Sequence, residues 1–501
     1  GRMTSGETAA PTSGLPTPLA THAAARPEAI ALDIDGETLT WARLADAVEI
    51  RAREIAALPP GGLALRLGNS VAFLVLFLAC ARAGREAQVL DPGWPTTTAA
   101  EVRAVLAPAL TVSECLEDAA HPGATLVVAP RAALADLPPL AAPRPGLLPA
   151  PDPESSFYVG FTSGSTGLPK GYRRAQRSWC ASFAVEAAEF ALGPADVVAA
   201  PAAFTHSLFL YAAVGGLHAG ATVVSMRRFR PEAVARRLLA GEITVLWGVP
   251  THLGLVLDRL AALDAVAPRL RLVLSGGAKW PAHRGADLAV RAPAALFAEF
   301  YGASELSFVA LARADEDVPE GSVGRPVAGV RVSVRDRRGR RLPPGRRGLV
   351  FVESDLTFID YAVGADAETC LRHGREIGVG DAGFLDARGF LHLSGRWNRM
   401  VVTSGRNVFP EEIERRVEAM SDVAAAAVVG MPDARRGERL LGAFAARGTA
   451  PSSAEIVARL RAVLPAAIVP TRWIELADWP RTPSGKTDFA AVAARLGEGR
   501  Q

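Results

Sequence analysis

The sequence predicts an α/β protein: a large N-terminal region of layered β/α subdomains with a small β-barrel subdomain, followed by a separate α+β C-terminal domain. Three observations support this prediction. A chain of 501 residues is too long for a single hydrophobic core and should divide into domains. Between residues 157 and 301, short apolar runs alternate with helical periodicity, which is typical of a mainly parallel sheet. Beyond residue 305 turn signals become frequent, and amphipathic helices return after residue 400.

The N-terminal segment, residues 17–115, alternates apolar runs with Ala-rich stretches that predict helices over 41–58 and 70–83. Thr40 should cap the first of these helices. A Pro-dense connector covers residues 130–155. Gly1 and Arg2 precede Met3, so we expect residues 1–16 to be an added scar followed by a disordered lead-in, with no signal peptide.

The central segment should form a parallel sheet covered by helices on both faces. Apolar runs predict strands at 157–161, 196–200, 222–226, 244–249, 271–275 and 295–300, and helical periodicity covers 231–240 and 250–263. Short polar or glycine-rich motifs follow four of these strands. Ligands bind in such folds where loops leave the carboxyl ends of strands, so these loops are the predicted site.

The turn-rich stretch from about 306 to 395 predicts the β-barrel-like subdomain, which would complete an N-terminal domain over 17–395. Residues 396–400 are the predicted hinge, and 401–501 the C-terminal domain. In that domain we expect helices over 410–420 and 453–464 and a short strand at 424–429.

Composition excludes several functional classes. A net charge of +3, with no basic block among aromatic residues, does not indicate nucleic-acid binding. The longest apolar run, 71–81, is about half a membrane span and predicts a buried helix, so we expect no membrane partner. Four scattered cysteines show neither metal-ligand spacing nor disulfide density, which fits a cytoplasmic protein.

The most informative stretch is the run that follows the predicted strand at 157–161. It is rich in glycine and hydroxyl side chains, so its backbone N–H groups can converge on one point, and Lys170 adds a charge. This is the chemistry of a polyphosphate cradle; a flexible linker is the alternative. A Walker A loop is excluded, because Lys170 lies between Pro169 and Gly171 rather than in Gly-Lys-Ser/Thr.

Lysine is scarce in this chain. Of 55 basic residues only Lys170, Lys279 and Lys486 are lysines. Arginine has replaced lysine almost everywhere that charge alone is needed, so each remaining lysine is a candidate for a role that needs a compact ammonium. Chance survival is the alternative for each, and is favoured for Lys279.

The run FYVGFTSGSTGLPKGYRR at 157–174 closely resembles the signature loop of the adenylate-forming superfamily, which includes acyl-CoA synthetases, luciferase and peptide-synthetase adenylation domains. Five further regions resemble that family in the same order. They are 204–207 (FTHS), 275–278 (SGGA), 301–305 (YGASE), 380–381 with 395–396 and 404–408 (GD, GR and SGRNV), and 482–486 (TPSGK).

The resemblance implies a role for each matching residue. The implied catalytic residues are Lys170, His206, Glu305 and Lys486. Those implied for ATP or AMP are Thr162, Ser163, Gly164, Ser165, Thr166, Gly167, Gly276, Gly277, Ala278, Tyr301, Gly302, Ser304, Asp381 and Arg396. Those implied for the acyl pocket are His206, Trp247, Gly277 and Gly302, and for the coenzyme A channel Ser404, Gly405 and Arg406. Glu305 and Thr166 would hold Mg²⁺, and Asn398 would be the hinge.

Each assignment has a structural alternative. His206 could be a helix-entry residue, Trp247 a core side chain, and Glu305 a helix-capping carboxylate. Asp381 and Arg396 could each belong to a surface ion pair, and Lys486 to a solvated turn.

The resemblance implies a two-step reaction with ATP, Mg²⁺ and coenzyme A, in which a mobile C-terminal domain rotates between the steps. A small carboxylic acid attacks ATP to give an acyl-adenylate, and a thiol then displaces AMP. No Asp occurs among residues 204–212, where peptide-synthetase domains carry one for an amino acid, so a non-amino acid is expected. Alternatives are a stand-alone enzyme that loads a separate carrier protein, a member limited to one half-reaction, and a member that binds without catalysing.

The hinge departs from the family pattern. The family usually reads Gly-Arg-x-Asp, with a Lys often four residues further on; here the last position is Asn398, and the lysine position is Val402. This change puts the balance between the two half-reactions in question.

Overall fold

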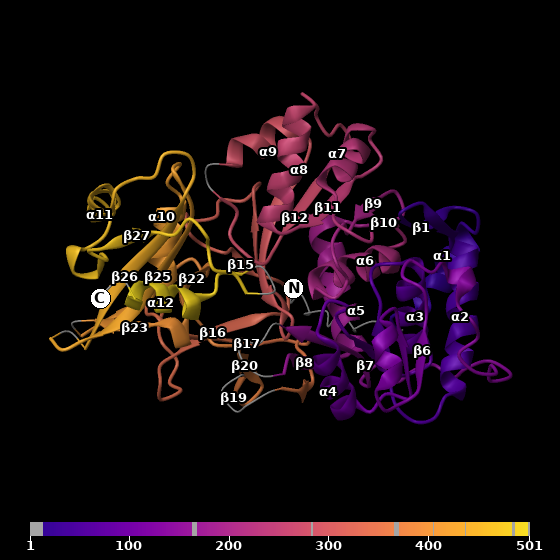
Figure 1. Ribbon diagram of the computed structural model, residues 1–501. Coiled ribbons are helices and arrows are strands. Elements are labelled where there is room, and N and C mark those ends of the chain that lie inside the picture. Colours follow the sequence, from indigo (N-terminus) through magenta and orange to yellow (C-terminus); the bar gives the residue numbers. More distant parts are fainter. Residues whose placement is uncertain are drawn as a thin grey trace, which may run out of the picture.

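The computed structural model describes residues 14–498, apart from 163–167, 282–283, 365–369, 404, 436 and 483–485. Four sheets organise this part of the chain (Figure 1). The C-terminal elements gather on one side of the molecule, away from the N-terminal helices. The predicted α/β class is confirmed.

A nine-stranded sheet forms the centre of the N-terminal region. Its strands, in spatial order, are β15 (Arg325–Pro326), β14 (Ser307–Arg313), β13 (Leu296–Ala303), β12 (Leu272–Ser275), β11 (Val245–Gly248), β9 (Val197–Ala199), β10 (Thr222–Ser225), β1 (Ile30–Ile34) and β2 (Glu37–Thr40). The strands from β13 to β1 run parallel, and antiparallel strands flank them. Four helices connect these strands: α6 (Ser207–Ala219), α7 (Pro231–Leu239), α8 (Pro250–Ala262) and α9 (Gly285–Arg291).

A second, seven-stranded sheet lies beside the first. Its order is β18 (Asp360–Val363), β8 (Lys170–Ala175), β7 (Ser156–Thr162), β4 (Ala87–Val89), β3 (Leu63–Arg66), β5 (Leu110–Ser113) and β6 (Thr125–Val127). The helices of this part are α1 (Thr17–Ala25), α2 (Trp41–Ala57), α3 (Val71–Arg82), α4 (Thr96–Leu106) and α5 (Gln176–Phe190). Residues 71–81 of α3 are all buried, because this helix is apolar on every face.

One topological expectation was wrong: the strand at 157–161 does not share a sheet with the strands that follow it up to residue 300. The chain turns back after Thr162, so β7 pairs antiparallel with β8 and parallel with β4. β8 is the next strand in the chain after β7, and a hairpin connection needs far fewer residues than a parallel crossover.

A six-stranded antiparallel sheet accounts for the turn-rich region. It contains β16 (Arg331–Arg335), β17 (Gly348–Glu353), β19 (Leu371–His373), β20 (Glu376–Gly378), β21 (Asp381–Leu385) and β22 (Leu391–Arg396). The other strands of this region join different sheets: β14 and β15 belong to the nine-stranded sheet, and β18 pairs with β8 of the second sheet. There Arg173 holds Asp360 through two hydrogen bonds of 2.6 and 2.7 Å.

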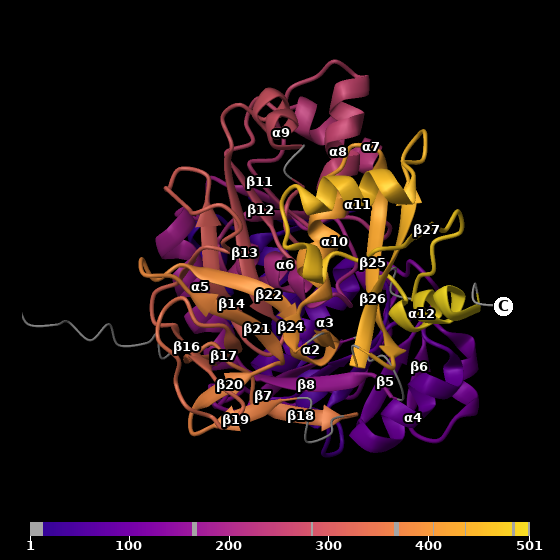
Figure 2. The same ribbon diagram turned by 90° about the vertical axis from the view of Figure 1, so that its left-hand side faces the viewer.

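The C-terminal part forms a five-stranded sheet with three helices (Figure 2). The strands are β23 (Val401–Thr403), β24 (Arg406–Val408), β25 (Val423–Asp433), β26 (Gly437–Ala446) and β27 (Trp473–Glu475), and the helices α10 (Pro410–Glu418), α11 (Ser453–Arg461) and α12 (Phe489–Glu498). Four short 3₁₀ turns complete the described elements: η1 (Leu116–Ala120), η2 (Leu134–Asp136), η4 (Trp397–Arg399) and η5 (Ala466–Ile468). The strand expected at 424–429 is longer than predicted, because β25 pairs along its whole length with β26.

Local sequence explains where several helices begin. The Thr40 hydroxyl accepts a 3.3 Å hydrogen bond from the Arg43 N–H, as predicted, and Ser70 caps α3 in the same way. Ser452 and Glu455 form a reciprocal capping box at the start of α11. Among the helices of the described residues, none is long and apolar enough to span a membrane.

Candidate active site

Three of the predicted motifs, at 204–207, 275–278 and 301–305, lie at the carboxyl ends of parallel strands in the nine-stranded sheet. The glycine turn at 276–278 follows β12, and Gly277 adopts a φ of +83° that glycine permits at little cost. A Cβ on Gly276 would collide with the Phe300 ring, so this turn can lie close against β13 only as glycine. Gly277 and Ala278 are exposed at this edge of the sheet.

The motif at 301–305 differs from its prediction as a loop. Tyr301 and Gly302 still belong to β13, which continues to residue 303 and pairs antiparallel with β14. The reason is a tight hairpin: residues 304–306 alone connect the two strands. A Cβ on Gly302 would collide with the Ser307 carbonyl, so the close approach of β13 and β14 at this position requires glycine.

A fully buried arginine that the sequence analysis missed supports this hairpin. Arg174 of β8 donates to the Ser304 carbonyl (3.1 Å), the Ser307 hydroxyl (2.5 Å) and the Leu356 carbonyl (2.5 Å). Burial lowers the pKa of Arg174 to about 10, and Glu305 is among the groups that oppose this shift. Three hydrogen bonds from this one arginine therefore hold the hairpin on both sides of Glu305 and the chain at Leu356. Arg174 ends the run 157–174 that resembles the signature loop, but the resemblance implied no role for it.

Glu305 itself is 8% exposed, and its carboxylate is held in place. The Tyr361 hydroxyl of β18 donates to its Oε1 at 2.8 Å. Burial and the adjacent carboxylate both raise the pKa of Tyr361, so the phenol remains a donor. A carboxylate oriented in this way is a hard oxygen ligand of the kind that Mg²⁺ prefers.

A second cluster joins three predicted residues from three strands. The Tyr301 hydroxyl donates to Asp381 Oδ2, and Arg396 Nη1 contacts Asp381 Oδ1 at 2.9 Å. Gly380, with a φ of +87°, turns the chain into β21 immediately before Asp381. An acceptor carboxylate flanked by a phenol and a guanidinium suits recognition of a sugar diol next to an aromatic base.

The third cluster combines the N-terminal region with the C-terminal part. His206 is the N-cap residue of α6, and the hydroxyl of the next residue, Ser207, lies 2.8 Å from that of Ser304. His206 is exposed by accessible surface, although many protein atoms lie around its ring. This desolvation, followed by the positive charge of Lys486 and by His252, lowers the pKa of His206 to about 4. The structure therefore brings His206 and Lys486 within electrostatic reach of each other.

Other predicted residues lie elsewhere or outside the described part. Lys170 opens β8 and pairs with Thr162, whereas Ser163, Gly164, Ser165, Thr166, Gly167 and Ser404 lie outside the described residues. Gly405 and Arg406 are exposed where β23 turns into β24. Asn398 lies in η4, next to Arg399, which forms a 2.6 Å ion pair with Glu414.

Two tryptophans and the third lysine also have defined places. Trp247 is 1% exposed and packs against Phe300 at a centroid distance of 5.7 Å. Trp280 packs with Phe297 in a separate core. Lys279 forms a 2.9 Å ion pair with Glu299. Among the described residues, no group of three His, Cys, Asp or Glu side chains could hold a metal ion by itself.

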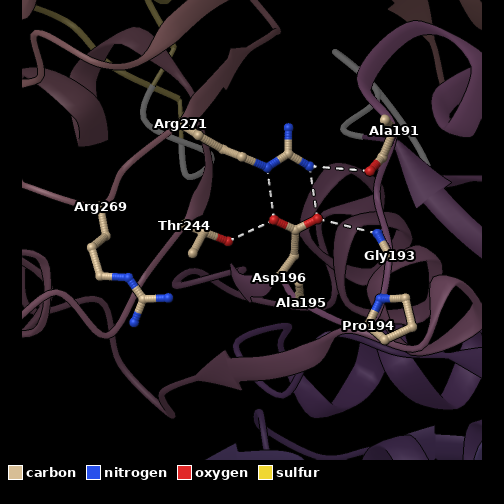
Figure 3. A pocket seen from close by; sticks show the side chains of 8 residues that line it. All are labelled: Ala191, Gly193, Pro194, Ala195, Asp196, Thr244, Arg269 and Arg271. Atoms are coloured by element: carbon tan, nitrogen blue, oxygen red, sulfur yellow. Dashed lines mark hydrogen bonds and ion pairs between the residues drawn. The ribbon is translucent and has the colours of Figure 1, made fainter.

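A pocket of about 540 Å³ lies at the opposite ends of the same strands (Figure 3). Asp196, Thr244 and Arg271 each directly precede a strand of the nine-stranded sheet. Arg271 holds Asp196 through two hydrogen bonds of 2.7 and 2.8 Å, and the Thr244 hydroxyl donates to the same carboxylate. The polar groups here satisfy one another, so this pocket is not the predicted site.

The chain matches the family described as AMP-binding enzyme over residues 19–362, and the AMP-binding enzyme C-terminal domain over 412–486. It is 35% identical over 480 residues to an uncharacterized acyl-CoA ligase, YhfT, of Bacillus subtilis, covering 95% of this chain and 97% of that protein. It is 32% identical to a fatty acid–[acyl-carrier-protein] ligase, ScoC, of Streptomyces coeruleorubidus, covering 93% of each.

A solved structure is also similar. The amide bond synthetase McbA from Marinactinospora thermotolerans is 28% identical, with a TM-score of 0.82 and coverage of 95% of this chain and 99% of that one. The family match extends over most of the chain, and the relatives match it nearly end to end. The chain therefore belongs to the AMP-binding enzymes, a family of ATP-dependent, AMP-forming ligases of the adenylate-forming superfamily.

Proposed function

We propose that this protein activates a non-amino carboxylic acid as its acyl-adenylate and transfers the acyl group to coenzyme A. The observation that supports this most directly is the convergence of Asp381, Glu305 and Lys486 on one edge of the nine-stranded sheet. Glu305 lies in the β13–β14 hairpin at that edge and accepts a hydrogen bond from Tyr361. Asp381 of β21 accepts a hydrogen bond from Tyr301 of β13, and the charge of Lys486, from the C-terminal part, lowers the pKa of His206.

In the first half-reaction, a carboxylate attacks the α-phosphorus of ATP and pyrophosphate leaves. Both reactants are anions, so most of the barrier is repulsion and positioning. Asp381 would accept hydrogen bonds from the ribose hydroxyls, with Tyr301 and Arg396 fixing its orientation. Lys486 would draw the substrate carboxylate and the α-phosphate together, and Lys170 with the adjacent loop would hold the departing phosphates.

Glu305 would hold Mg²⁺, together with Thr166, and the ion would supply neutralising charge to the phosphates. His206 stays neutral at physiological pH because its pKa is low, so it can contact the substrate carboxyl without forming an ion pair. A neutral ring also avoids competing with Lys486 for the carboxylate.

In the second half-reaction Lys486 would leave the site, and the turn that carries Gly405 and Arg406 would line the path of the thiol. Asn398 would be the pivot. The exposure of Gly405 and Arg406 in the present arrangement is consistent with a surface that is used only after the domain rotates.

A separate carrier protein is the second candidate acceptor, because ScoC, to which the chain is similar over 93% of its length, is named for that acceptor. Exchange of labelled pyrophosphate into ATP across a panel of acids tests adenylation. AMP release with coenzyme A, with a phosphopantetheinylated carrier protein and with neither identifies the acceptor. Absence of exchange with every acid, combined with thioester formation from a supplied adenylate, would contradict the two-step proposal.

A further inference from the structure

A cluster of aromatic rings lies one helical turn beyond Ser207 on α6. Tyr211 is four residues after Ser207 and therefore on the same face of the helix. Four rings surround the Tyr211 ring, at centroid distances of 5.4, 5.0, 5.9 and 5.7 Å: Trp179, Phe183, Trp247 and Phe308. Phe300 adds a further wall by packing on Trp247 and Phe308.

Polar groups are buried behind this aromatic cluster. The Tyr211 hydroxyl lies 2.8 Å from the Ser182 hydroxyl of α5. One turn further along α5, Glu186 is 2% exposed, and its Oε1 has no hydrogen-bond partner among the described residues. Burial raises the pKa of Glu186 to about 8, and hydrogen bonding to Tyr211 opposes that rise.

This carboxyl group is tightly confined. A Cβ on Gly215 of α6 would lie 2.9 Å from the Phe183 ring and 3.2 Å from Glu186 Oε2, so the two helices approach closely at glycine. A buried acceptor without a partner typically costs about 1–3 kcal/mol. Nothing in the packing of α5 against α6 requires an acid here, since an apolar side chain of the same size would avoid that cost.

Two rings of the described aromatic cluster, Tyr211 and Phe300, keep part of their surface accessible. Tyr211 and Phe300 are both half-buried, as are Ser207 and Ser304, while Trp247 is buried behind them. Ser207 and Tyr211 share one face of α6, and Ser207 contacts the residue that precedes Glu305. The accessible surface of Tyr211 therefore continues that of the residues expected to hold the reacting carboxylate.

We propose that this surface binds the far end of a compact aromatic carboxylic acid that carries a hydrogen-bonding substituent, and that the Tyr211 hydroxyl contacts that substituent. Ser182 and Glu186 are positioning residues that orient the phenol. The inference rests on the proposed function. One helical turn rises about 5.4 Å, comparable to the length of one benzene ring between the carboxyl and a para substituent. Surrounding rings favour an aromatic ligand through edge-to-face packing.

Long alkyl chains would have to displace buried rings. Trp247 and Phe308 close the space beyond Tyr211, and both are at most 5% exposed. Interiors are packed too densely for such a displacement to be free. Trp247 and Phe308 therefore argue against a long-chain fatty acid as the substrate of this protein.

The test is pyrophosphate exchange by the full-length protein with benzoate, 4-hydroxybenzoate, 4-aminobenzoate, octanoate and palmitate. We expect higher kcat/KM for the two substituted benzoates than for benzoate, and little exchange with palmitate. Tyr211→Phe should reduce the preference for 4-hydroxybenzoate over benzoate about tenfold, the value of one buried hydrogen bond. Glu186→Gln should keep most of that preference because it conserves the hydrogen-bonding group, whereas Glu186→Leu should lose it.

Tyr158→Phe is the matched control. The Tyr158 hydroxyl also makes one buried hydrogen bond, 3.1 Å to Tyr172, and its ring packs on Trp179 at 5.3 Å. Tyr158 is fully buried, so this variant removes a phenol hydroxyl from the same aromatic network without removing the proposed contact. An equal loss of preference in the Tyr158 and Tyr211 variants would overturn the proposal, as would palmitate or octanoate being the best acid of the wild-type protein. If no acid supports exchange, the proposed function fails first, and this inference fails with it.

Discussion

Replacing Lys486 by Ala removes the positive charge that the C-terminal part brings beside His206. At an effective dielectric constant of about 20, a charge about 4 Å from a reacting phosphate is worth about 4 kcal/mol. Lys486 is exposed to solvent, and screening lowers this value. We take about 3 kcal/mol, which corresponds to a loss of roughly 10²-fold in the rate of adenylation.

The assay must separate the two half-reactions. Pyrophosphate exchange measures adenylation, and thioester formation from a supplied acyl-adenylate measures the second step. We expect K486A to lose the first by at least about 10²-fold and to keep the second. Lys279→Ala is the matched control, because Lys279 is held by Glu299 at 2.9 Å and by the Ser322 carbonyl at 3.1 Å, outside the three clusters.

A second readout tests the geometry itself. Because the Lys486 charge lowers the pKa of His206, K486A should raise that pKa. Loss of the protein environment around the ring would raise the pKa as well, so the Tm of K486A must stay at the wild-type value for the shift to report on the charge. NMR titration of the assigned His206 resonance measures the shift. An unchanged His206 pKa, or equal loss of both half-reactions, would refute the reasoning.

Three further predictions concern separate parts of the site. Asp381→Asn removes the charge that Arg396 contacts at 2.9 Å, so the KM for ATP should rise about tenfold with little change in the KM for the acid; equal increases would contradict a ribose role. Tyr361→Phe removes the 2.8 Å hydrogen bond to Glu305, so a Mg²⁺ titration of exchange should show a several-fold higher requirement, and an unchanged requirement would separate Glu305 from the metal. Glu186 has a folded-state pKa raised from 4.5 to about 8, so the folded protein loses stability relative to the unfolded chain as pH rises between these values. The Tm of Glu186→Gln relative to wild type should therefore increase from pH 5 to pH 8.5, and a difference that does not depend on pH would exclude this ionisation.

Much of the fold could be predicted because it depends on neighbours in the chain. The helix after Thr40 and the apolar helix at 71–82 follow from capping and hydrophobic periodicity, which act over a few residues. The parallel strands β9 to β13 and the turns after them were visible as apolar runs followed by glycine or proline. The alternation of these strands with helices is visible in the order of residues along the chain, so it could be predicted without the structure.

Errors arose where pairing partners decide the structure. The strand β7 could join either the nine-stranded sheet or its own hairpin partner, and an apolar run does not distinguish these. Tyr301 was expected in a loop, yet the β13–β14 hairpin extends the strand past it. Arg174 carried no signal either, because a basic residue in a strand is usually at a surface and only its buried partners show otherwise.

By itself, the sequence determined the chemistry of this protein. The glycine-rich run before Lys170, and the retention of lysine at 170 and 486 in a chain that otherwise uses arginine, point to a polyphosphate site, and the resemblance of six ordered regions to the adenylate-forming superfamily implies carboxylate activation. Only the tertiary structure decided which side chains share a site. Tyr301 and Asp381 are 80 positions apart in the chain and form one hydrogen bond. Tyr211 and Glu186 interact through a buried hydrogen bond that no sequence motif indicated. Residue type limits what a side chain can do, whereas burial and distant partners, which arise only when the chain closes on itself, determine what it contacts.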